Sequence, residues 1–247
     1  GYSSAASDVY KRQIHKRLDE IERIHAIYSP VKLGLAAALA CCAFTFLLGG
    51  GPVEMILAFL CAGIGNVIRT KLIKHNFTLF LNIAVSISCS CLLYSILLKL
   101  AEILFHVSAL HEAGYICSIL FIIPGFPFIT SGIDLSKLDL RSGLERLSYS
   151  IIIVLVATMT AWIMALLLHL QPLNFTALNL DPILLLILRL LTSFCGVFGF
   201  SIMFNSPVKM AAIAAVMGAL SNTLRLELVD LTGMPTTAAA FIGALTA

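Results

Sequence analysis

Residues 122–134 read Ile-Ile-Pro-Gly-Phe-Pro-Phe-Ile-Thr-Ser-Gly-Ile-Asp, at the end of a long apolar run. Two prolines and a glycine in four positions cannot continue a regular helix, because proline lacks a backbone donor and restricts the residue before it. Inside a bilayer, broken backbone is tolerated only where protein or a wet cavity satisfies the freed carbonyl groups. We therefore treat this stretch as a candidate site on a broken membrane helix.

The composition indicates a polytopic membrane protein. Of the 247 residues, 60% are hydrophobic and 12% are charged, whereas a soluble domain carries roughly 25% charged residues. A formal net charge of +3 does not favour nucleic acid as a partner. The seven cysteines lie in apolar runs without neighbouring metal ligands, so we interpret them as packing residues and expect no metal or cofactor. No nucleotide-binding or hydrolase motif is present, so neither ATP-driven transport nor enzymatic activity is expected.

Apolar runs of membrane-spanning length follow one another along the chain. We expect an all-α bundle of about eight transmembrane helices, at about residues 31–48, 53–68, 77–98, 113–133, 147–170, 182–204, 207–224 and from 236 onward. Residues 14–30 have helical spacing of apolar positions between charges, which predicts a cytoplasmic amphipathic helix. Residues 1–13 are polar and rich in serine, unlike the segments that follow, and we interpret them as a non-native leader.

Basic residues are distributed unequally between the two sides of these spans. One side carries thirteen of the sixteen Lys and Arg residues, in the N-terminal segment and in the loops that follow the second, fourth and sixth spans. Lys99 and Arg225 fall on the other side, and Arg189 lies within a span. The positive-inside rule therefore predicts a cytoplasmic N-terminus.

Two segments share the pattern Pro-Val-x-Met, an apolar run and Asn-x-x-Arg-x-x-Leu. They begin at Pro52 and at Pro207. The second segment lies five spans after the first, an odd number, so it enters the membrane in the opposite orientation. We expect a 5+5 inverted-repeat bundle, with a first repeat at 31–172 and the start of a second, truncated repeat at 173–247; chance similarity between small-residue helices is the alternative. Inverted repeats are typical of transporters that bind substrate on broken helices at the repeat interface.

Polar groups around the break are candidates for substrate binding or coupling. Pro124, Gly125 and Pro127 free backbone carbonyl groups, and the hydroxyl groups of Thr130 and Ser131 follow closely. These groups could bind the ammonium or hydroxyl group of a small amino acid, and a purely structural kink is the alternative.

Further candidates are charged or amide side chains near the cytoplasmic mouth or within spans. Asp134, Asp139 and Arg146 precede the fifth span, where helix capping is the alternative role. A charge in mid-membrane is costly unless it faces a cavity or a partner, so Arg189 could bind a substrate carboxylate or pair with Asp181. Asn66 and Asn222 occupy matching positions in the two repeat segments, and either line the interface between repeats or cap helix ends.

The order of several motifs resembles the threonine/serine exporter (ThrE) family. These are Arg17-Leu-Asp-Glu-Ile-Glu-Arg23 with Tyr28-Ser-Pro30, Phe46-Leu-Leu-Gly-Gly-Gly51, Ile123-Pro-Gly-Phe-Pro127, the spaced Asp134, Asp139, Gly143 and Arg146, Asn205-Ser-Pro207, and Gly218 to Arg225. One departure is Leu138, where the family usually has glycine.

The resemblance implies a secondary transporter of a prokaryotic cytoplasmic (inner) membrane. It implies export of threonine, serine or similar small amino acids, driven by the proton-motive force. The expected partners are the lipid bilayer, the substrate and protons, and this interpretation is compatible with a homo-oligomer. A small dicarboxylate (succinate-like) exporter is the alternative within the family. An intramembrane enzyme using Asp134 and Asp139, or an uncoupled channel, is less favoured because no activating motif or metal set accompanies the two carboxylates.

Overall fold

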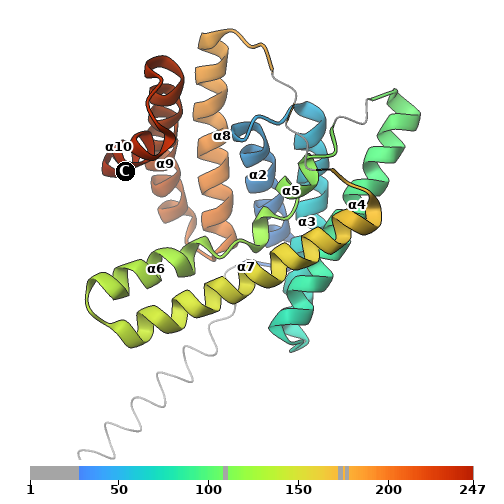
Figure 1. Ribbon diagram of the computed structural model, residues 1–247, viewed down its shortest axis with the longest axis horizontal. Helices are drawn as coiled ribbons and strands as arrows, with labels where there is room; N and C mark the ends of the chain where they lie inside the picture. The colour runs from blue at the N-terminus through green and yellow to red at the C-terminus, as the bar shows by residue number, and fades with distance from the viewer. Residues whose placement is uncertain (1–27, 108–110, 172–174, 176–177, 247) are drawn as a thin grey trace, which may run out of the picture.

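A computed structural model describes residues 28–107, 111–171, 175 and 178–246 of the chain, and in these ranges all regular elements are helical (Figure 1). They are α2 (Pro30–Leu47), α3 (Pro52–Lys74), α4 (Leu79–Phe105), α5 (Gly114–Cys117), η2 (Leu120–Ile122), α6 (Gly125–Ser136), α7 (Leu140–Leu168), α8 (Pro182–Met203), α9 (Val208–Thr232) and α10 (Thr236–Thr246). Within the described ranges, six helices are long and apolar enough to cross a membrane, or seven if the bent pair Gly114–Ile122 and Gly125–Ser136 is one span, where about eight spans were expected. The all-α, polytopic prediction is confirmed. The predicted leader and nearly all of the predicted amphipathic helix lie outside the described residues.

Four helices extend beyond the predicted spans. α3 continues to Lys74 and α4 to Phe105, where the predicted spans ended at about residues 68 and 98. α7 begins at Leu140 instead of Leu147, because the Asp139 side chain caps its first turn by accepting the Ser142 N–H. α9 continues to Thr232 instead of ending at Leu224. Its last turns contain Glu227 and Asp230, which are charge-paired across the helix interface, so these acidic residues do not end the helix.

The fourth predicted span is the broken one. Its two halves, Gly114–Ile122 and Gly125–Ser136, meet at an angle of 55°. Pro124 has φ −83° and ψ 59°, and the Gly125 N–H donates to the Ile123 carbonyl oxygen at 2.9 Å. These values define an inverse γ-turn. Pro127 then lies in the first turn of α6, where a missing N–H costs no intrahelical hydrogen bond.

The buried core lies between α2, α3 and α4, where small residues allow close approach. Ala37, Cys41, Ala58 and Cys61 are all fully buried, and a Cβ added to Gly63 would lie 3.1 Å from the Ala38 Cβ. Small residues at such interfaces are the usual means by which membrane helices associate. All seven cysteines are free, in agreement with a packing role.

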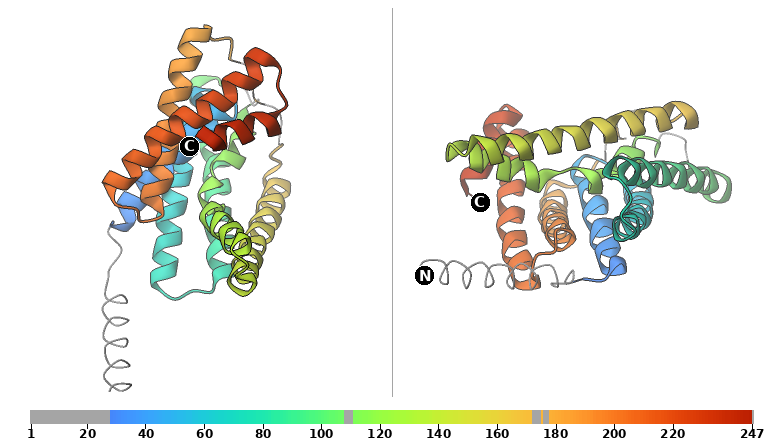
Figure 2. Two further views of the ribbon diagram at one scale, coloured as in Figure 1. Left: turned by 90° about the vertical axis from the view of Figure 1, so that its left-hand side faces the viewer. Right: turned by 90° about the horizontal axis from the view of Figure 1, so that it is seen from below.

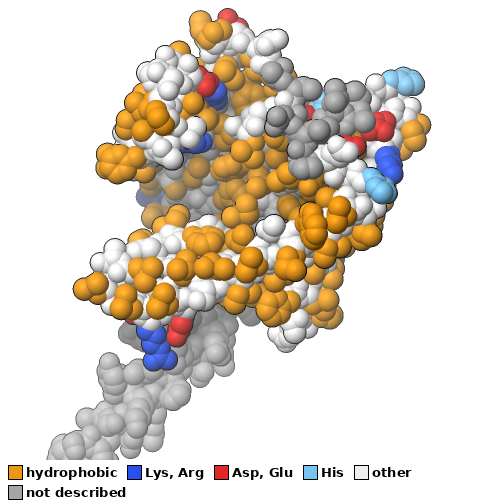
Figure 3. Space-filling model, in the orientation of Figure 1, with side chains coloured by type: hydrophobic (Ala, Val, Ile, Leu, Met, Phe, Trp, Pro, Cys, Tyr) orange, Lys and Arg blue, Asp and Glu red, His pale blue; other side chains and the backbone are white. Residues whose placement is uncertain are grey.

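The α6–α7 hairpin projects to one side of this core (Figures 1 and 2). A Cβ on Gly143 would lie 2.7 Å from Leu135 Cγ, so the two helices are closely packed at their connection. Hydrophobic side chains cover much of α7 and also the hollow between this hairpin and α8 (Figure 3). Exposed apolar surface on this scale is what a lipid-facing helix requires.

α8 packs against α2 and runs in the opposite direction (Figure 1). A Cβ on Gly199 would lie 3.0 Å from Ala40 Cβ, and one on Gly196 would lie 3.6 Å from Ala43 Cβ. The rings of Phe44 and Phe200 meet with centroids 5.2 Å apart. A shift of 156 residues turns Ala40 into Gly196, Ala43 into Gly199 and Phe44 into Phe200. The contact between α2 and α8 is therefore reciprocal: Ala40 faces Gly199, and Gly196, the counterpart of Ala40, faces Ala43, the counterpart of Gly199.

Candidate functional site

The break opens onto a cavity between α6, α2 and α8. This cavity has a volume of about 560 Å³, within the range of about 300–1,000 Å³ that is usual for ligand pockets. Gly125 and Phe126 line it from α6, Phe44 from α2, and Phe200 and Ser201 from α8. Its wall is mostly apolar, with hydroxyl groups and backbone as the polar component.

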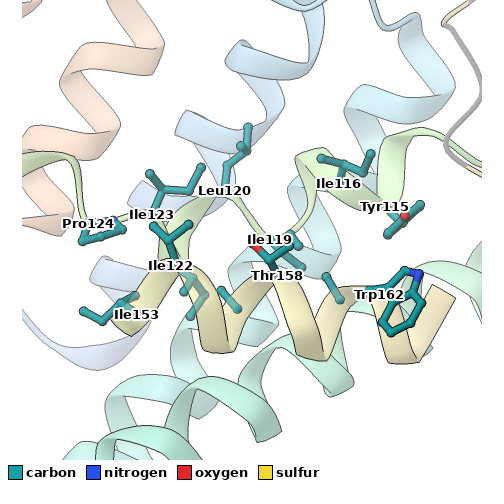
Figure 4. A pocket seen from close by; sticks show the side chains of 13 residues that line it. Tyr115, Ile116, Ile119, Leu120, Ile122, Ile123, Pro124, Ile153, Thr158 and Trp162 are labelled. Atoms are coloured by element: carbon teal, nitrogen blue, oxygen red, sulfur yellow. The ribbon is translucent and has the colours of Figure 1, made fainter. Parts of the chain in front are cut away.

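A second cavity lies on the other side of the same segment, against α7 (Figure 4). It measures about 410 Å³ and is lined by Ile116, Ile119 and Pro124 from the broken segment and by Thr158 and Trp162 from α7. The break thus separates two cavities, and Leu120 and Ile123 contribute to both. A change in the angle at Pro124 would alter both volumes.

A side chain from α3 satisfies a carbonyl group just before the break. Arg69 Nη1 donates to the Phe121 carbonyl oxygen at 3.0 Å. Three residues earlier on the same helix, Asn66 Nδ2 donates to the Leu33 carbonyl oxygen of α2 at 3.0 Å. The Asn-x-x-Arg pattern therefore ties α3 to α2 and to the broken segment. Arg69 is one of the basic residues counted in the predicted loop after the second span, but it lies within α3, where its i, i+3 spacing from Asn66 puts both side chains on one helix face.

The other candidates near the break hold α6 to itself and to α7. Thr130 Oγ1 donates to the Phe126 carbonyl oxygen of its own helix at 3.0 Å, and Ser131 Oγ donates to the Gly143 carbonyl oxygen of α7 at 2.8 Å. Arg146 Nη1 lies 2.9 Å from Asp134 Oδ2 as an ion pair between α6 and α7. Asp134 lies inside α6 instead of in a loop.

Asp139 is the N-cap of α7. Hydrogen bonds from Ser142, helped by the charge of Arg146, lower the pKa of this exposed carboxyl group below its ordinary value. The capping role that was the alternative in the sequence analysis is thus present in the structure.

Arg189 pairs with two carboxylates of α9. Its guanidinium group donates to Glu227 at 2.7 Å and to Asp230. The suggested pairing with Asp181 is wrong, because Asp181 caps α8 by accepting the Ile183 N–H. The two acidic residues lie beyond Leu224, where the predicted span ended, so this pairing was not expected.

Asn222 holds α9 to α8. Its Nδ2 donates to Ser193 Oγ at 2.8 Å, and its Oδ1 accepts from Arg225 at 2.9 Å. Asn66 and Asn222 thus each bridge neighbouring helices. The structure does not bring Asn222 or Arg189 into hydrogen-bond contact with the break among the described residues.

A buried acid–imidazole pair went unnoticed in the sequence. Glu54, in the first turn of α3, has no exposed surface. Its Oε1 lies 2.6 Å from His111 Nδ1, and its Oε2 accepts the Gly51 N–H at 3.0 Å. The sequence signal was weak, because the two residues are 57 positions apart.

These features define a polytopic helical membrane protein with a broken span between two cavities. Residues 3–168 match the family described as "Putative threonine/serine exporter" (ThrE). Because the match covers more than half of the chain, the chain belongs to the ThrE family. The matched region ends at Leu168, the last residue of α7, and so includes the break and the α6–α7 hairpin. No curated protein and no solved structure matches the chain.

Proposed function

We propose that this chain exports threonine, serine or similar small amino acids, and that the substrate binds at the Pro124–Gly125 break. The ThrE family supports an exporter, without fixing the substrate or the driving force. The observation that carries the proposal is the break itself, because it lies within the matched region and opens onto a cavity of about 560 Å³. The substrate carboxylate would face the start of α6, where helix N–H groups favour an anion.

The other polar groups of a hydroxy amino acid would use backbone and hydroxyl partners. The carbonyl oxygens of Ile123 and Pro124 already accept from the N–H groups of Gly125 and Phe128, and each has a second lone pair that could accept from an ammonium group. Ser201 offers a hydroxyl on the opposite wall of the cavity. The apolar walls suit a small side chain. Asp134, Asp139 and Arg146 lie farther along α6 and α7, and we assign them to holding the hairpin in position.

We further infer that the chain contains an inverted repeat with an offset of 156 residues. The reciprocal contact of α2 with α8 supports it, and so do the two helix hairpins. Gly50 N–H donates to the Thr45 carbonyl oxygen, and Ser206 N–H donates to the Ser201 carbonyl oxygen, at the same offset. Gly49 and Asn205 both have positive φ at these turns. Asn66 and Asn222 are also 156 residues apart.

The orientation and driving force follow from the same reasoning. The basic residues of the α3–α4 and α6–α7 connections support a cytoplasmic location for these loops and for the N-terminus. The resemblance to the exporter family supports the cytoplasmic membrane of a prokaryotic cell. The given sequence contains no nucleotide-binding motif, which speaks against ATP as the energy source within this chain. Coupling to the proton-motive force is proposed from the resemblance to the exporter family.

Reconstitution in liposomes tests the substrate and the coupling. We expect labelled threonine to exchange with internal unlabelled threonine or serine, and to move against its gradient when a pH gradient is imposed. A protonophore should abolish the uphill movement and leave the exchange. If succinate exchanges and threonine does not, the amino-acid proposal is wrong and the dicarboxylate alternative is supported. Movement that only ever follows the gradient would support a channel.

A further inference from the structure

Glu54 and His111 form a contact that a packing role alone does not require. Glu54 is fully buried, and the side chain of His111 retains 18% exposure. A buried carboxylate is costly in a bundle surrounded by lipid unless it is paired or protonated. His111 therefore connects a wholly buried acid to the outside of the helix bundle.

The geometry of the pair sets the number of protons that it holds. A separation of 2.6 Å between Glu54 Oε1 and His111 Nδ1 is a hydrogen bond, so at least one proton lies between these atoms. With this proton alone, the pair is a carboxylate and a neutral imidazole with a charge of −1. A second proton, taken up at His111 Nε2, gives a pair with zero net charge. The pair can thus bind and release one proton without breaking its hydrogen bond.

No basic side chain other than His111 forms an ion pair with Glu54 among the described residues. The titratable groups around the pair come from neighbouring elements: Tyr94 of α4, Cys117 of α5 and Glu112. Tyr94 donates to the His111 carbonyl oxygen at 2.6 Å. Glu112 accepts the Gln171 N–H at 2.9 Å. None of the three side chains can supply a positive charge, so the charge of Glu54 is neutralised by a proton bound within the Glu54–His111 pair, of which His111 is the partly exposed member.

The pair also holds one end of the broken span. His111 precedes α5, and a Cβ on Gly114 would lie 3.1 Å from Glu54 Cβ, so α5 rests directly on this acid. The other end of the segment is held by Arg69 through Phe121, on the same helix as Glu54. α3 therefore holds the segment leading to the break at two points about 22 Å apart along its axis. A change of charge at the Glu54–His111 pair therefore alters how strongly α3 holds the segment that leads to the break.

We propose that Glu54 and His111 form the proton-binding site that couples transport to the broken span. The inference rests on the proposed function, since it names the pair that accepts the driving proton. In the proposed topology this end of α3 faces the outside, where a proton would enter through His111. Proton loading would convert the pair into a carboxylate and an imidazolium, whose charge-assisted hydrogen bond holds α5 more tightly, and proton release would weaken that hold.

The single tryptophan gives a test that needs no substrate. Trp162 of α7 lines the same cavity as Tyr115 and Ile116 of the broken segment (Figure 4). We expect its fluorescence in the liposome-embedded chain to depend on pH, and Glu54→Gln to remove this dependence. Glutamine keeps an acceptor for Gly51 N–H and cannot ionise. Glu102→Gln, on partly exposed α4 surface, is the matched control and should titrate as the wild type does.

A transport assay in liposomes is the second part of this test. Glu54→Gln should retain threonine exchange within about threefold and lose uphill movement driven by a pH gradient by at least about tenfold. A titration that persists in Glu54→Gln, or its absence from the wild type, would overturn the proton site. Loss of both exchange and uphill transport in Glu54→Gln would show a purely structural pair and also overturn it. Failure of the wild type to exchange threonine, with the Trp162 titration present and dependent on Glu54, would instead count against the substrate proposed above.

Discussion

The guanidinium group of Arg69 donates to the carbonyl oxygen of Phe121, 52 residues away and on the segment that ends at the break. Helix geometry stops in this segment, so its carbonyl groups lose their normal intrahelical donors. Lipid provides no hydrogen-bond donors that could replace them. A neighbouring helix therefore supplies the donor, and the broken span depends on α3 for its shape.

Substitution of Arg69 should destabilise the broken segment. Arg69→Gln leaves the Phe121 carbonyl group without its donor, at a cost of about 1–3 kcal/mol. We expect a lower thermal unfolding midpoint in detergent and loss of transport in liposomes. Lys71→Gln is the control, because Lys71 is exposed on the same helix. Equal unfolding midpoints for Arg69→Gln and wild type would refute the role given to this contact.

Gly125→Leu should block transport and leave the fold intact. A Cβ at Gly125 meets no atom within 4 Å, so the backbone tolerates a side chain, which would occupy the cavity that Gly125 lines. Gly132 lies on the same helix and has equal space around it, so Gly132→Leu is a matched control. Threonine exchange should vanish in the first variant and persist in the second. If both variants exchange threonine, the break is a structural kink only.

Gly199→Leu should separate α2 from α8. A Cβ at Gly199 would lie 2.6 Å from the Ala36 carbonyl oxygen, so the helices must move apart. Overpacking of this kind costs typically about 1–3 kcal/mol. We expect a lower unfolding midpoint, measured in detergent against Ala214→Leu on the exposed face of α9. Equal midpoints in the two variants would mean that the α2–α8 contact adds nothing to stability.

Asp139 should give the fold a defined response to acid. Its pKa is lowered by hydrogen bonds from Ser142, so the folded state favours the ionised cap. This stabilisation is present above the ordinary carboxyl pKa of about 4 and is lost as the pH falls through the lowered value. Asp139→Asn keeps an acceptor but cannot titrate, so its unfolding midpoint should change less than that of the wild type from pH 5 to pH 2. A parallel pH dependence in both proteins would exclude this role; Glu145→Gln serves as the control.

Cysteine labelling should settle the orientation. A membrane-impermeant maleimide added outside intact cells should label Asn179→Cys, between α7 and α8, and spare His75→Cys, between α3 and α4. The unsubstituted chain measures background labelling of the native cysteines. Labelling of His75→Cys alone would place the N-terminus outside.

The prediction of the fold succeeded where chemistry is local. A Pro-Gly-Phe-Pro sequence must interrupt a helix wherever it lies, so the break could be located from the residues alone. Apolar length likewise identified the long helices. The ends of α7 and α9 could not be predicted, because they depend on the Asp139 cap and on the pairing of Arg189 with Glu227 across two helices.

The candidate site likewise contains features that local sequence predicts and others that depend on contacts between distant residues. Thr130, Ser131 and Asp134 follow the break on α6, whereas Arg189 and Asn222 bond to residues of α8 and α9, and none of these partners could be assigned from the sequence. Thr130 and Ser131 bond to backbone of α6 and α7. His111 gave no signal, because its importance depends on a distant helix bringing Glu54 beside it. Long-range pairing of buried polar groups is a property of the packed structure.

The inverse γ-turn at Pro124 has a consequence for how the first helices can rearrange. On one side of the turn, η2 is bound to α3 through Arg69 and Phe121. On the other side, α6 is bound to α7 through Ser131 and Gly143. The turn is a single residue closed by a single hydrogen bond, whereas α7 is also packed on α4 and contributes Ile153 and Ala165 to the buried core. We expect α6 and the first turns of α7 to move together about Pro124 while the rest of α7 stays packed on α4, so that one cavity narrows as the other widens.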